Sequence, residues 1–428
     1  MVLYDQGILP LRHSPGPKPR AGRSAVHDRE PTETIMSAAP RIPYNRPCLL
    51  GTELAYVQEA MHSGHQSGNG PFSKRCERLL EQRIGCRRAM LTPSCTHALE
   101  LAALLLDLGP GDEVIMPSFT FVSTANAFAL RGATVVFVDN LPDTLNIDPD
   151  QVADAITDRT RAIVPVHYAG VPCDMDALSA IAAPRNITIV EDAAQALGSA
   201  YRGKPAGSLG HMAAVSFHET KNVTSGGEGG ALLINDPTLV ERAEIVREKG
   251  TNRSAFFRGQ VDKYTWVDIG SSLLPSELQA AYLCAQLESI DSINDNRLRT
   301  WTRYDTYLRE YSSPLRGPTI PKDTQHNGHI FHLRADSLAH RSALLRHLND
   351  HGIHAVFHYV PLHSAPGANG RSRFHGIDRH TTLQSELLLR LPLWYGMPDE
   401  LIDHVCTSVR AAWNYVSTTA GGRLTGTW

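Results

Sequence analysis

A repeated alternation of short apolar runs and helical stretches is the feature that most constrains how this chain folds. Between Gly51 and Asn235, five runs rich in β-branched residues are separated by helical or loop segments. The runs are Glu113–Pro117, Thr134–Asp139, Ala162–Val166, Ile187–Asp192 and Ala231–Ile234. Such runs are typical of strands buried on both faces of a parallel sheet. The pattern predicts an α/β fold with a mostly parallel sheet, in which ligands bind at the carboxyl ends of the strands.

Length and local composition predict two folded domains. The 428 residues exceed a typical domain of about 100–200 residues. We expect a disordered N-terminal extension rich in Pro, Arg, Ser and Gly, a large domain and a smaller α+β domain, at 1–40, 41–290 and 291–428 respectively. Met36 lies just before the structured sequence, which suggests the hypothesis of a start codon assigned too far upstream. An intact-mass measurement on natively expressed protein tests it.

A long helical pattern connects the two expected domains. It begins at Pro275, continues towards Leu308, and has Ser276 as a plausible N-cap. The smaller domain then shows a strand at 330–333 and a helix at 341–348. No internal repeat is evident in this pattern.

Bulk composition excludes several classes of partner. A formal net charge of -3 gives no electrostatic signature of nucleic-acid binding. The 7 cysteines are scattered and contain no Cys-x-x-Cys pair, which favours a reducing cytoplasm over zinc or disulfide chemistry. Apolar runs fall short of the roughly 20 residues that span a bilayer, and no export leader opens the chain, so we expect no membrane segment.

Lys221 lies where a strand-like segment passes into the glycine-rich turn of Val215–Gly230. A lysine amine must lose its proton to attack an aldehyde, and burial beside apolar or cationic groups lowers the pKa of the amine. The segment therefore makes Lys221 a candidate for forming a Schiff base. The alternative is a solvated loop lysine, because most lysines are exposed.

Asp192 ends the predicted strand Ile187–Asp192 in an apolar stretch. A buried carboxylate needs a positive partner, and the protonated ring nitrogen of pyridoxal phosphate is one. Holding that proton keeps the ring an electron sink for amino transfer. If a helix begins there, Gln195 lies near the O3′ side of the ring. The alternative is that Asp192 caps that helix.

Ser94, Cys95 and Thr96 precede an apolar helical run, so free backbone N–H groups and the helix dipole could hold a phosphate. Ordinary helix capping by these residues explains the same pattern. The chain has no Gly-x-x-x-x-Gly-Lys-Ser/Thr loop and no strand-linked Gly-x-Gly-x-x-Gly, which argues against a nucleoside triphosphatase or a dinucleotide site.

Five histidines crowd one stretch of the expected smaller domain: His354, His358, His363, His375 and His380. Their spacing matches no compact zinc pattern and no paired cysteines accompany them. We therefore predict no metal site and interpret them as surface or substrate-contacting residues.

Taken together, these segments resemble the DegT/DnrJ/EryC1/StrS family of sugar aminotransferases from about Ile42 to Val416. The resemblance is strongest to the members that make dTDP-4-amino-4,6-dideoxygalactose. It rests on six motifs in the family's order: Thr92–Thr96, Pro117–Asn126, Val164–Gly170, Ser216–Asn222, Arg247–Arg253 and Phe257–Trp266. The family implies the type I pyridoxal-phosphate transferase fold and a homodimer.

The resemblance implies a role for each matching residue. Lys221 falls on the Schiff-base lysine and Asp192 on the acid that pairs with the pyridine nitrogen. Phe121 falls where an aromatic ring stacks on the cofactor. The phosphate contacts fall on Thr96 and Ser216, and on Asn252, which would reach the phosphate from the neighbouring subunit: the active sites would then be shared. Family members that dehydrate sugars carry histidine at position 221, so the lysine favours amination.

The implied reaction uses L-glutamate and dTDP-4-dehydro-6-deoxy-D-glucose to give dTDP-4-amino-4,6-dideoxy-D-galactose and 2-oxoglutarate. A role in the biosynthesis of a cell-surface polysaccharide, of the enterobacterial common antigen kind, would follow. Alternatives are a nucleotide-sugar aminotransferase acting at C3 or giving the gluco epimer. A non-catalytic regulator on this fold would need an appended DNA-binding helix pair, for which the Pro-rich extension at 1–40 is too short.

Overall fold

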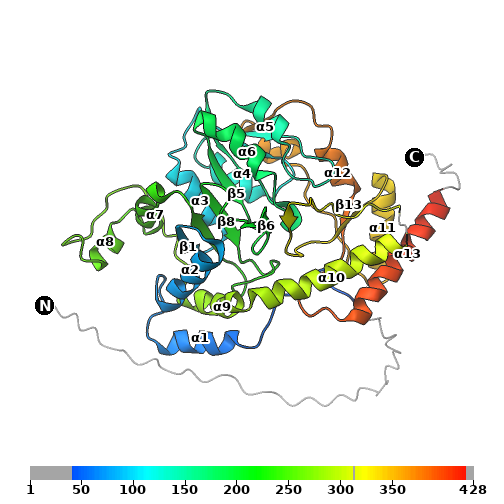
Figure 1. The fold of residues 1–428 in the computed structure, drawn as a ribbon, viewed down its shortest axis with the longest axis horizontal. Helices are drawn as coiled ribbons and strands as arrows, with labels where there is room; N and C mark the ends of the chain where they lie inside the picture. The colour runs from blue at the N-terminus through cyan, green and yellow to red at the C-terminus, as the bar shows by residue number, and fades with distance from the viewer. Residues whose placement is uncertain (1–40, 312–313, 421–428) are drawn as a thin grey trace, which may run out of the picture. The chain divides into compact units, whose positions relative to one another are not determined.

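The computed structural model describes residues 41–311 and 314–420. The predicted extension at 1–40 lies outside these residues. The described chain contains a large sheet with the strand order β1-β9-β8-β5-β4-β2-β3-β12 (Figure 1). The strands are β1 (Arg88–Thr92), β2 (Glu113–Pro117), β3 (Thr134–Val138), β4 (Thr160–Ile163), β5 (Thr188–Asp192), β8 (Met212–Ser216), β9 (Gly230–Ile234) and β12 (Ser372–Phe374).

The sheet is mostly parallel, as the sequence predicts. The strands from β8 to β12 in this order run parallel to their neighbours, whereas β9 is antiparallel to both β1 and β8. The parallel strands therefore end at one edge of the sheet, where β5 and β8 lie side by side. This arrangement places Asp192, the last residue of β5, next to the segment that follows β8.

Helices cover both faces of the sheet because alternate strand residues point to opposite sides. Val114 and Met116 pack with one group of helices, α3 (Cys95–Leu105), α4 (Val122–Ala129) and α7 (Val240–Arg247). Ile115 packs on the other face with α5 (Pro149–Ala155) and α6 (Met175–Ala182). On that face, α2 (Pro71–Ile84) and α9 (Glu277–Glu288) cover the other end of the sheet. α1 (Glu53–His62) packs on α9.

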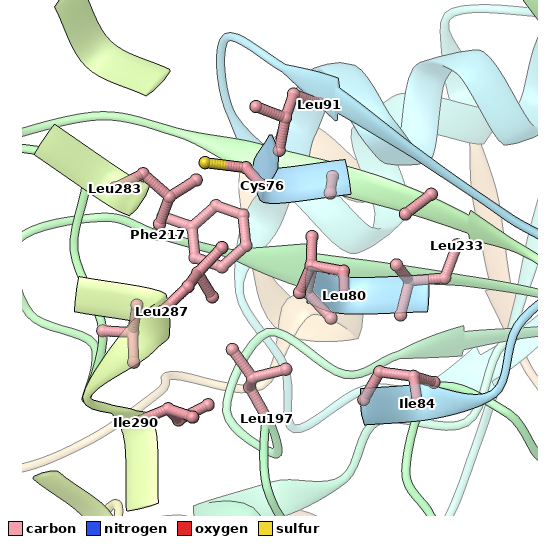
Figure 2. Packing of buried hydrophobic residues seen from close by; sticks show 14 of the residues in the cluster. Cys76, Leu80, Ile84, Leu91, Leu197, Phe217, Leu233, Leu283, Leu287 and Ile290 are labelled. Atoms are coloured by element: carbon pink, nitrogen blue, oxygen red, sulfur yellow. The ribbon is translucent and has the colours of Figure 1, made fainter. Parts of the chain in front are cut away.

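A buried cluster lies directly behind the segment that carries Lys221. Figure 2 shows Phe217, the residue after β8, surrounded by Leu80 of α2 and by Leu283 and Leu287 of α9. Burying an aromatic side chain of this size contributes roughly 1.5–3 kcal/mol. The cluster thus fixes the start of the segment that leads from the sheet to Lys221.

The prediction of one long helix from Pro275 towards Leu308 is wrong in one respect. The segment forms two helices, α9 and α10 (Ile290–Glu310). Ser276 caps α9 with a reciprocal capping box. The chain then leaves helical geometry at Ser289, and α10 begins at the next residue. Apolar side chains continue across the break with helical spacing, at Leu287, Ile290 and Ile293, so the sequence gives no sign of it.

The C-terminal part of the described chain builds a second core. It contains α11 (Leu338–Asp350), α12 (Thr381–Leu387), α13 (Asp399–Ala420) and a two-stranded antiparallel sheet of β11 (His332–Arg334) and β13 (Leu388–Arg390). α13 packs along α10, as Figure 1 shows. A separate three-stranded sheet consists of β6 (Ala200–Tyr201), β7 (Lys204–Pro205) and β10 (Thr324–Gln325). The short helix α8 (Arg253–Phe257) follows α7 in the chain.

The boundary predicted between 290 and 291 stays a prediction. It coincides with the start of α10. The C-terminal part nevertheless returns to the large sheet, since β12 pairs with β3. No helix in the described ranges is both long and apolar enough to cross a membrane.

Candidate active site

A cavity of about 690 Å³ opens at the carboxyl ends of β5 and β8. This volume lies within the roughly 300–1,000 Å³ of small-molecule sites. Eight of the nine side chains that the sequence predicts for the site line it: Ser94, Cys95, Thr96, Phe121, Asp192, Gln195, Ser216 and Lys221. Segments separated by more than a hundred residues therefore meet here, in the place that the fold predicts.

Lys221 lies in a turn after β8, where its backbone N–H donates to the carbonyl of His218 at 2.9 Å. Burial lowers the pKa of the lysine amine below its ordinary value. The charge of Arg390 lowers it further, whereas negative charge on Cys95 or Asp192 raises it. Because desolvation is the largest of these effects, the amine loses its proton more readily than a lysine in water.

A buried amide network anchors the lysine turn to α10. The Asn222 side chain donates to Asn294 Oδ1 at 2.8 Å and to the Asn327 carbonyl at 2.9 Å. Its own oxygen lies 2.9 Å from Nδ1 of His329, which also lines the cavity. Both donors of Asn222 are engaged, so its oxygen is the acceptor and Nδ1 of His329 carries a proton. The network fixes the residue next to Lys221.

Asp192 is 5% exposed, and its carboxylate accepts two hydrogen bonds. Thr124 Oγ1 donates at 2.7 Å and the backbone N–H of Ala194 at 3.2 Å. The alternative in which Asp192 caps a helix is wrong, because a series of turns follows β5. These two donors hold the carboxylate in the cavity wall, where it can face a positively charged group.

Gln195 reaches the cavity without the helix that the sequence argument invoked. Its Oε1 accepts from the Ala169 N–H at 2.7 Å, and its Nε2 donates to the Tyr359 hydroxyl at 2.9 Å. These two contacts determine which end of the amide is oxygen. The Gln195 amide is therefore held in one orientation beside Asp192.

Small hydroxyl residues gather at the N-terminus of α3. Ser94 is the N-cap, and its oxygen accepts from the His97 N–H at 3.2 Å. Thr96 donates to Ser123 Oγ at 2.8 Å. Helix capping thus takes place, and it leaves the dipole of an 11-residue helix at the cavity wall. Capping and anion binding are compatible at this end.

Phe121 presents an open aromatic surface to the cavity. Its side chain is 57% exposed although it lines the site. Its ring centroid lies 6.4 Å from that of Tyr359, so the two rings do not stack closely on each other. A flat exposed ring in a concave site is suited to stacking on a planar ligand.

Asn252 is the one predicted residue that does not line the cavity. It lies at the start of α8, where its Oδ1 accepts from the Thr265 N–H at 2.8 Å. The family resemblance implies that it reaches the site of a neighbouring subunit. Its role therefore stays a prediction.

The histidine-rich stretch does not gather at one point. His358 lines the cavity with its Nδ1 2.8 Å from the Tyr168 hydroxyl, whereas His363 Nδ1 lies 2.7 Å from Ser118 Oγ. The His380 backbone N–H donates to Asp139. No cluster of three or more metal-binding side chains occurs among residues 41–311 and 314–420.

Several cavity residues were missed by the sequence argument: Tyr44, Thr124, Arg297, His329, Tyr359 and Arg390. Thr124 lies within the motif Pro117–Asn126, so its place in the site could have been predicted from the sequence. The two arginines follow no motif and come from α10 and β13. Only the tertiary fold brings them to the lysine.

Comparison with known proteins identifies the family. Residues 47–410 match the model of the DegT/DnrJ/EryC1/StrS aminotransferase family. The chain belongs to this family. It is 34% identical over 377 residues to spore coat polysaccharide biosynthesis protein SpsC from Bacillus subtilis (strain 168), covering 86% of this chain and 96% of that protein.

Solved structures of aminotransferases share the fold. The aminotransferase TlmJ from Streptoalloteichus hindustanus is 32% identical, with a TM-score of 0.81, covering 88% of this chain and 100% of that one. The putative sugar aminotransferase Spr1654 from Streptococcus pneumoniae, in its PLP form, is 28% identical with a TM-score of 0.79, covering 88% and 99%. The predicted type I fold is thus confirmed, and the family uses pyridoxal phosphate.

The residues in the cavity fit this cofactor. The site combines an amine with a lowered pKa, a buried carboxylate, an exposed aromatic ring and a helix N-terminus with hydroxyl groups. Pyridoxal phosphate has one complementary group for each: an aldehyde, a ring nitrogen, a planar ring and a phosphate. Lys221, Asp192, Phe121 and Ser94 with Thr96 are therefore suited to hold it.

Proposed function

We propose that this aminotransferase transfers the amino group of L-glutamate to dTDP-4-dehydro-6-deoxy-D-glucose. The products are dTDP-4-amino-4,6-dideoxy-D-galactose and 2-oxoglutarate. The observation that supports amino transfer most strongly is the meeting of Lys221, Asp192 and the α3 hydroxyl groups in one cavity. The choice of sugar rests on the resemblance of the motifs from Thr92 to Trp266, and a cytoplasmic location and a role in polysaccharide biosynthesis are parts of the proposal.

The cofactor, when bound, supplies an aldehyde that accepts the amino group and a ring that takes up electron density. Lys221 would act first by binding that aldehyde and then, once released, as a base. Its Nζ would remove the proton from Cα of the donor. The lowered pKa of Lys221 favours this step because the amine gives up its proton more readily than an exposed lysine does.

Asp192 would hold a proton on the cofactor's ring nitrogen through its buried carboxylate. Thr124 and the Ala194 N–H keep that carboxylate in place. Phe121 would stack on one face of the ring, and Ser94, Thr96 and Ser216 would bind the phosphate. Gln195, fixed by Ala169 and Tyr359, would donate its second N–H towards the ring oxygen.

In the second half of the reaction Lys221 would return a proton to C4 of the sugar. An axial amine, and with it the galacto configuration, arises if the sugar presents the matching face to Nζ. Stereochemistry therefore depends on how the sugar is oriented above Lys221. The gluco alternative differs in this orientation, whereas amination at C3 requires a sugar whose keto group is at C3.

We also propose a homodimer with shared active sites. The segment that carries Asn252 bears several exposed apolar side chains: Phe257, Tyr264, Trp266, Val267 and Ile269. Exposed apolar patches of this kind favour burial against a partner surface. A second copy covering this segment would bring its Asn252 to the phosphate of the first copy.

The test combines absorbance spectra with product analysis. The purified protein with pyridoxal phosphate should lose the absorbance of the lysine-bound cofactor on adding L-glutamate and regain it on adding dTDP-4-dehydro-6-deoxy-D-glucose. NMR of the product should show an axial amine at C4.

Two variants control this experiment. Lys221→Ala should abolish both spectral changes, whereas Lys204→Ala, at an exposed position, should leave them unchanged. An amine at C3 or an equatorial amine would refute the proposed sugar specificity. Full turnover by Lys221→Ala would refute the assignment of the lysine.

A further inference from the structure

His329 lines the cavity and is held in its wall by hydrogen bonds on three sides. Its backbone N–H donates to Asn327 Oδ1 at 3.1 Å, and its carbonyl accepts from Arg297 Nη2 at 2.7 Å. Its ring nitrogen Nδ1 lies 2.9 Å from Asn222 Oδ1. The residue is 8% exposed. The imidazole is therefore fixed beside Asn222, the residue that follows Lys221 in the chain.

These contacts also decide which ring nitrogen carries the proton. The Asn327 carbonyl can only accept, so the Asn222 nitrogen faces it, at 2.9 Å. The Asn222 oxygen then faces Nδ1 of His329, which must donate. In a neutral imidazole the other nitrogen, Nε2, has a lone pair and accepts. Within residues 41–311 and 314–420, Nε2 has no hydrogen-bond partner, and it is open to the cavity.

The imidazole of His329 is neutral in this environment. Burial lowers its pKa well below the ordinary value of a histidine. The positive charges of Lys221, Arg297 and Arg390 lower the pKa further. The ring therefore stays unprotonated at neutral pH, because both effects disfavour a cation. Nε2 is then an acceptor of hydrogen bonds and cannot donate one.

An unpaired histidine nitrogen does not by itself mark a binding site in this chain. Nδ1 of His332 also has no hydrogen-bond partner, but it is sealed inside the protein, and His332 does not line the cavity. His358 does line the cavity, yet its Nδ1 contacts the Tyr168 hydroxyl, which can either donate or accept. His329 differs from both, because its tautomer is fixed and a ligand can reach its lone pair.

A ligand group that meets this acceptor must be a hydrogen-bond donor close to the reacting carbon. In the proposed function Lys221 returns a proton to C4 of the sugar, so C4 lies within reach of the lysine amine. His329 is hydrogen-bonded to the neighbour of Lys221 and its ring is affected by the charge of that amine. In a 4-dehydro-6-deoxy sugar, C5 bears the ring oxygen and a methyl group, neither of which can donate. The hydroxyl group on C3 is the donor next to the reacting carbon.

We propose that Nε2 of His329 accepts a hydrogen bond from the C3 hydroxyl group of the sugar and so selects sugars that carry this group. The inference rests on the proposed function. The amino-acid donor has no hydroxyl group, so the contact belongs to the second half of the reaction. A sugar without the C3 hydroxyl group leaves a fixed acceptor unpaired, which costs free energy.

The test compares dTDP-4-dehydro-6-deoxy-D-glucose with its 3-deoxy analogue. The measured quantity is the preference, the ratio of kcat/KM for the two sugars. His329→Asn keeps an N–H near the position of Nδ1 for Asn222 and has no atom at the position of Nε2. This variant should lower the preference by about 10- to 100-fold, because the unsubstituted protein alone loses a hydrogen bond with the analogue. Loss of a purely structural contact would slow both sugars equally.

The matched control is His329→Gln. Its amide oxygen can reach the position of Nε2, whereas the contact with Asn222 is lost. This variant should slow both sugars and keep the preference. Stopped-flow absorbance separates the two halves of the reaction. In His329→Asn the half-reaction with the sugar should slow by about 10- to 100-fold, and the half-reaction with L-glutamate by much less.

An unchanged preference in His329→Asn would overturn the proposal. Equal use of the two sugars by the unsubstituted protein would overturn it as well, and needs no variant. If the glutamate and sugar half-reactions slowed equally in His329→Asn, the residue would act on Lys221 and not on the sugar. Failure of the unsubstituted protein to aminate the 4-dehydro sugar would refute the proposed function, and this inference with it. That failure is seen before any variant is made, so the two failures are distinguishable.

Discussion

Burial of the Lys221 side chain disfavours a positive charge on its amine. Because its pKa is lowered in the folded protein, the unfolded chain binds more protons between that lowered pKa and the ordinary value of about 10.5. The stability of the cofactor-free protein should therefore rise with pH through this window. At pH values below this window, the burial of the charged Lys221 amine lowers the stability of the folded, cofactor-free protein.

Lys221→Met should make the cofactor-free protein more stable than the unsubstituted one at neutral pH. The methionine fills similar space and has no charge to bury. The gain should shrink as the pH approaches the ordinary pKa of lysine. Thermal unfolding of both proteins over a pH series measures this, with Lys204→Met as the exposed control. A gain in stability that has the same size at all pH values would contradict the account, and so would a loss of stability at neutral pH.

Single residues could be predicted from sequence where a motif fixes both the residue and its position in the fold. Lys221 follows a strand-like segment and Asp192 ends a predicted strand, while Ser94 precedes a predicted helix. Arg390 and Arg297 could not be predicted in this way. Their place depends on how the C-terminal elements pack over the sheet, and no local pattern encodes that packing.

At the scale of elements, strand β9 and helix α3 approach each other at Gly230. A Cβ at this position would lie 2.4 Å from both the Cys95 nitrogen and the Ser94 carbonyl carbon. These are backbone atoms, so no flexible side chain can move away. The glycine therefore allows the N-terminus of α3 to lie against the sheet beside the cavity.

Gly230→Ala should move the α3 N-terminus and lower the free energy of unfolding by about 1–3 kcal/mol. It should also weaken the binding of pyridoxal phosphate, because the hydroxyl groups at that terminus would shift. Urea unfolding and a cofactor titration measure the two effects. Gly109→Ala is the matched control, since a Cβ there has no atom within 4 Å. Native cofactor affinity in Gly230→Ala would count against a role for the α3 terminus.

The elements were predictable where periodicity and composition agreed. β2 has the predicted bounds, Glu113–Pro117, because it is an apolar run that ends at a proline. β12 was missed because three residues with a central arginine carry no strand signal. The break at Ser289 was missed for the opposite reason, since apolar spacing continues through it.

At the scale of the whole molecule, the proposed dimer makes each site depend on two chains. One chain would supply Lys221 and the other Asn252. Two inactive variants could then complement each other in a hybrid dimer, because one of its two sites would be intact.

Lys221→Ala and Asn252→Asp test this arrangement. The aspartate should repel the cofactor phosphate and weaken its binding. Mixing the two variants under conditions that exchange subunits should restore activity to about a quarter of the unsubstituted enzyme, since half of the dimers are hybrids with one intact site. Activity that stays at the sum of the separate variants would contradict shared sites.

The most direct test of the central claim is to identify the residue that binds the cofactor. The purified protein is loaded with pyridoxal phosphate and reduced with sodium borohydride, which makes the bond between lysine and cofactor permanent. Peptide mass spectrometry then locates the modification. The account predicts a single modified residue, Lys221. Modification of a different lysine, or none at all, would contradict it.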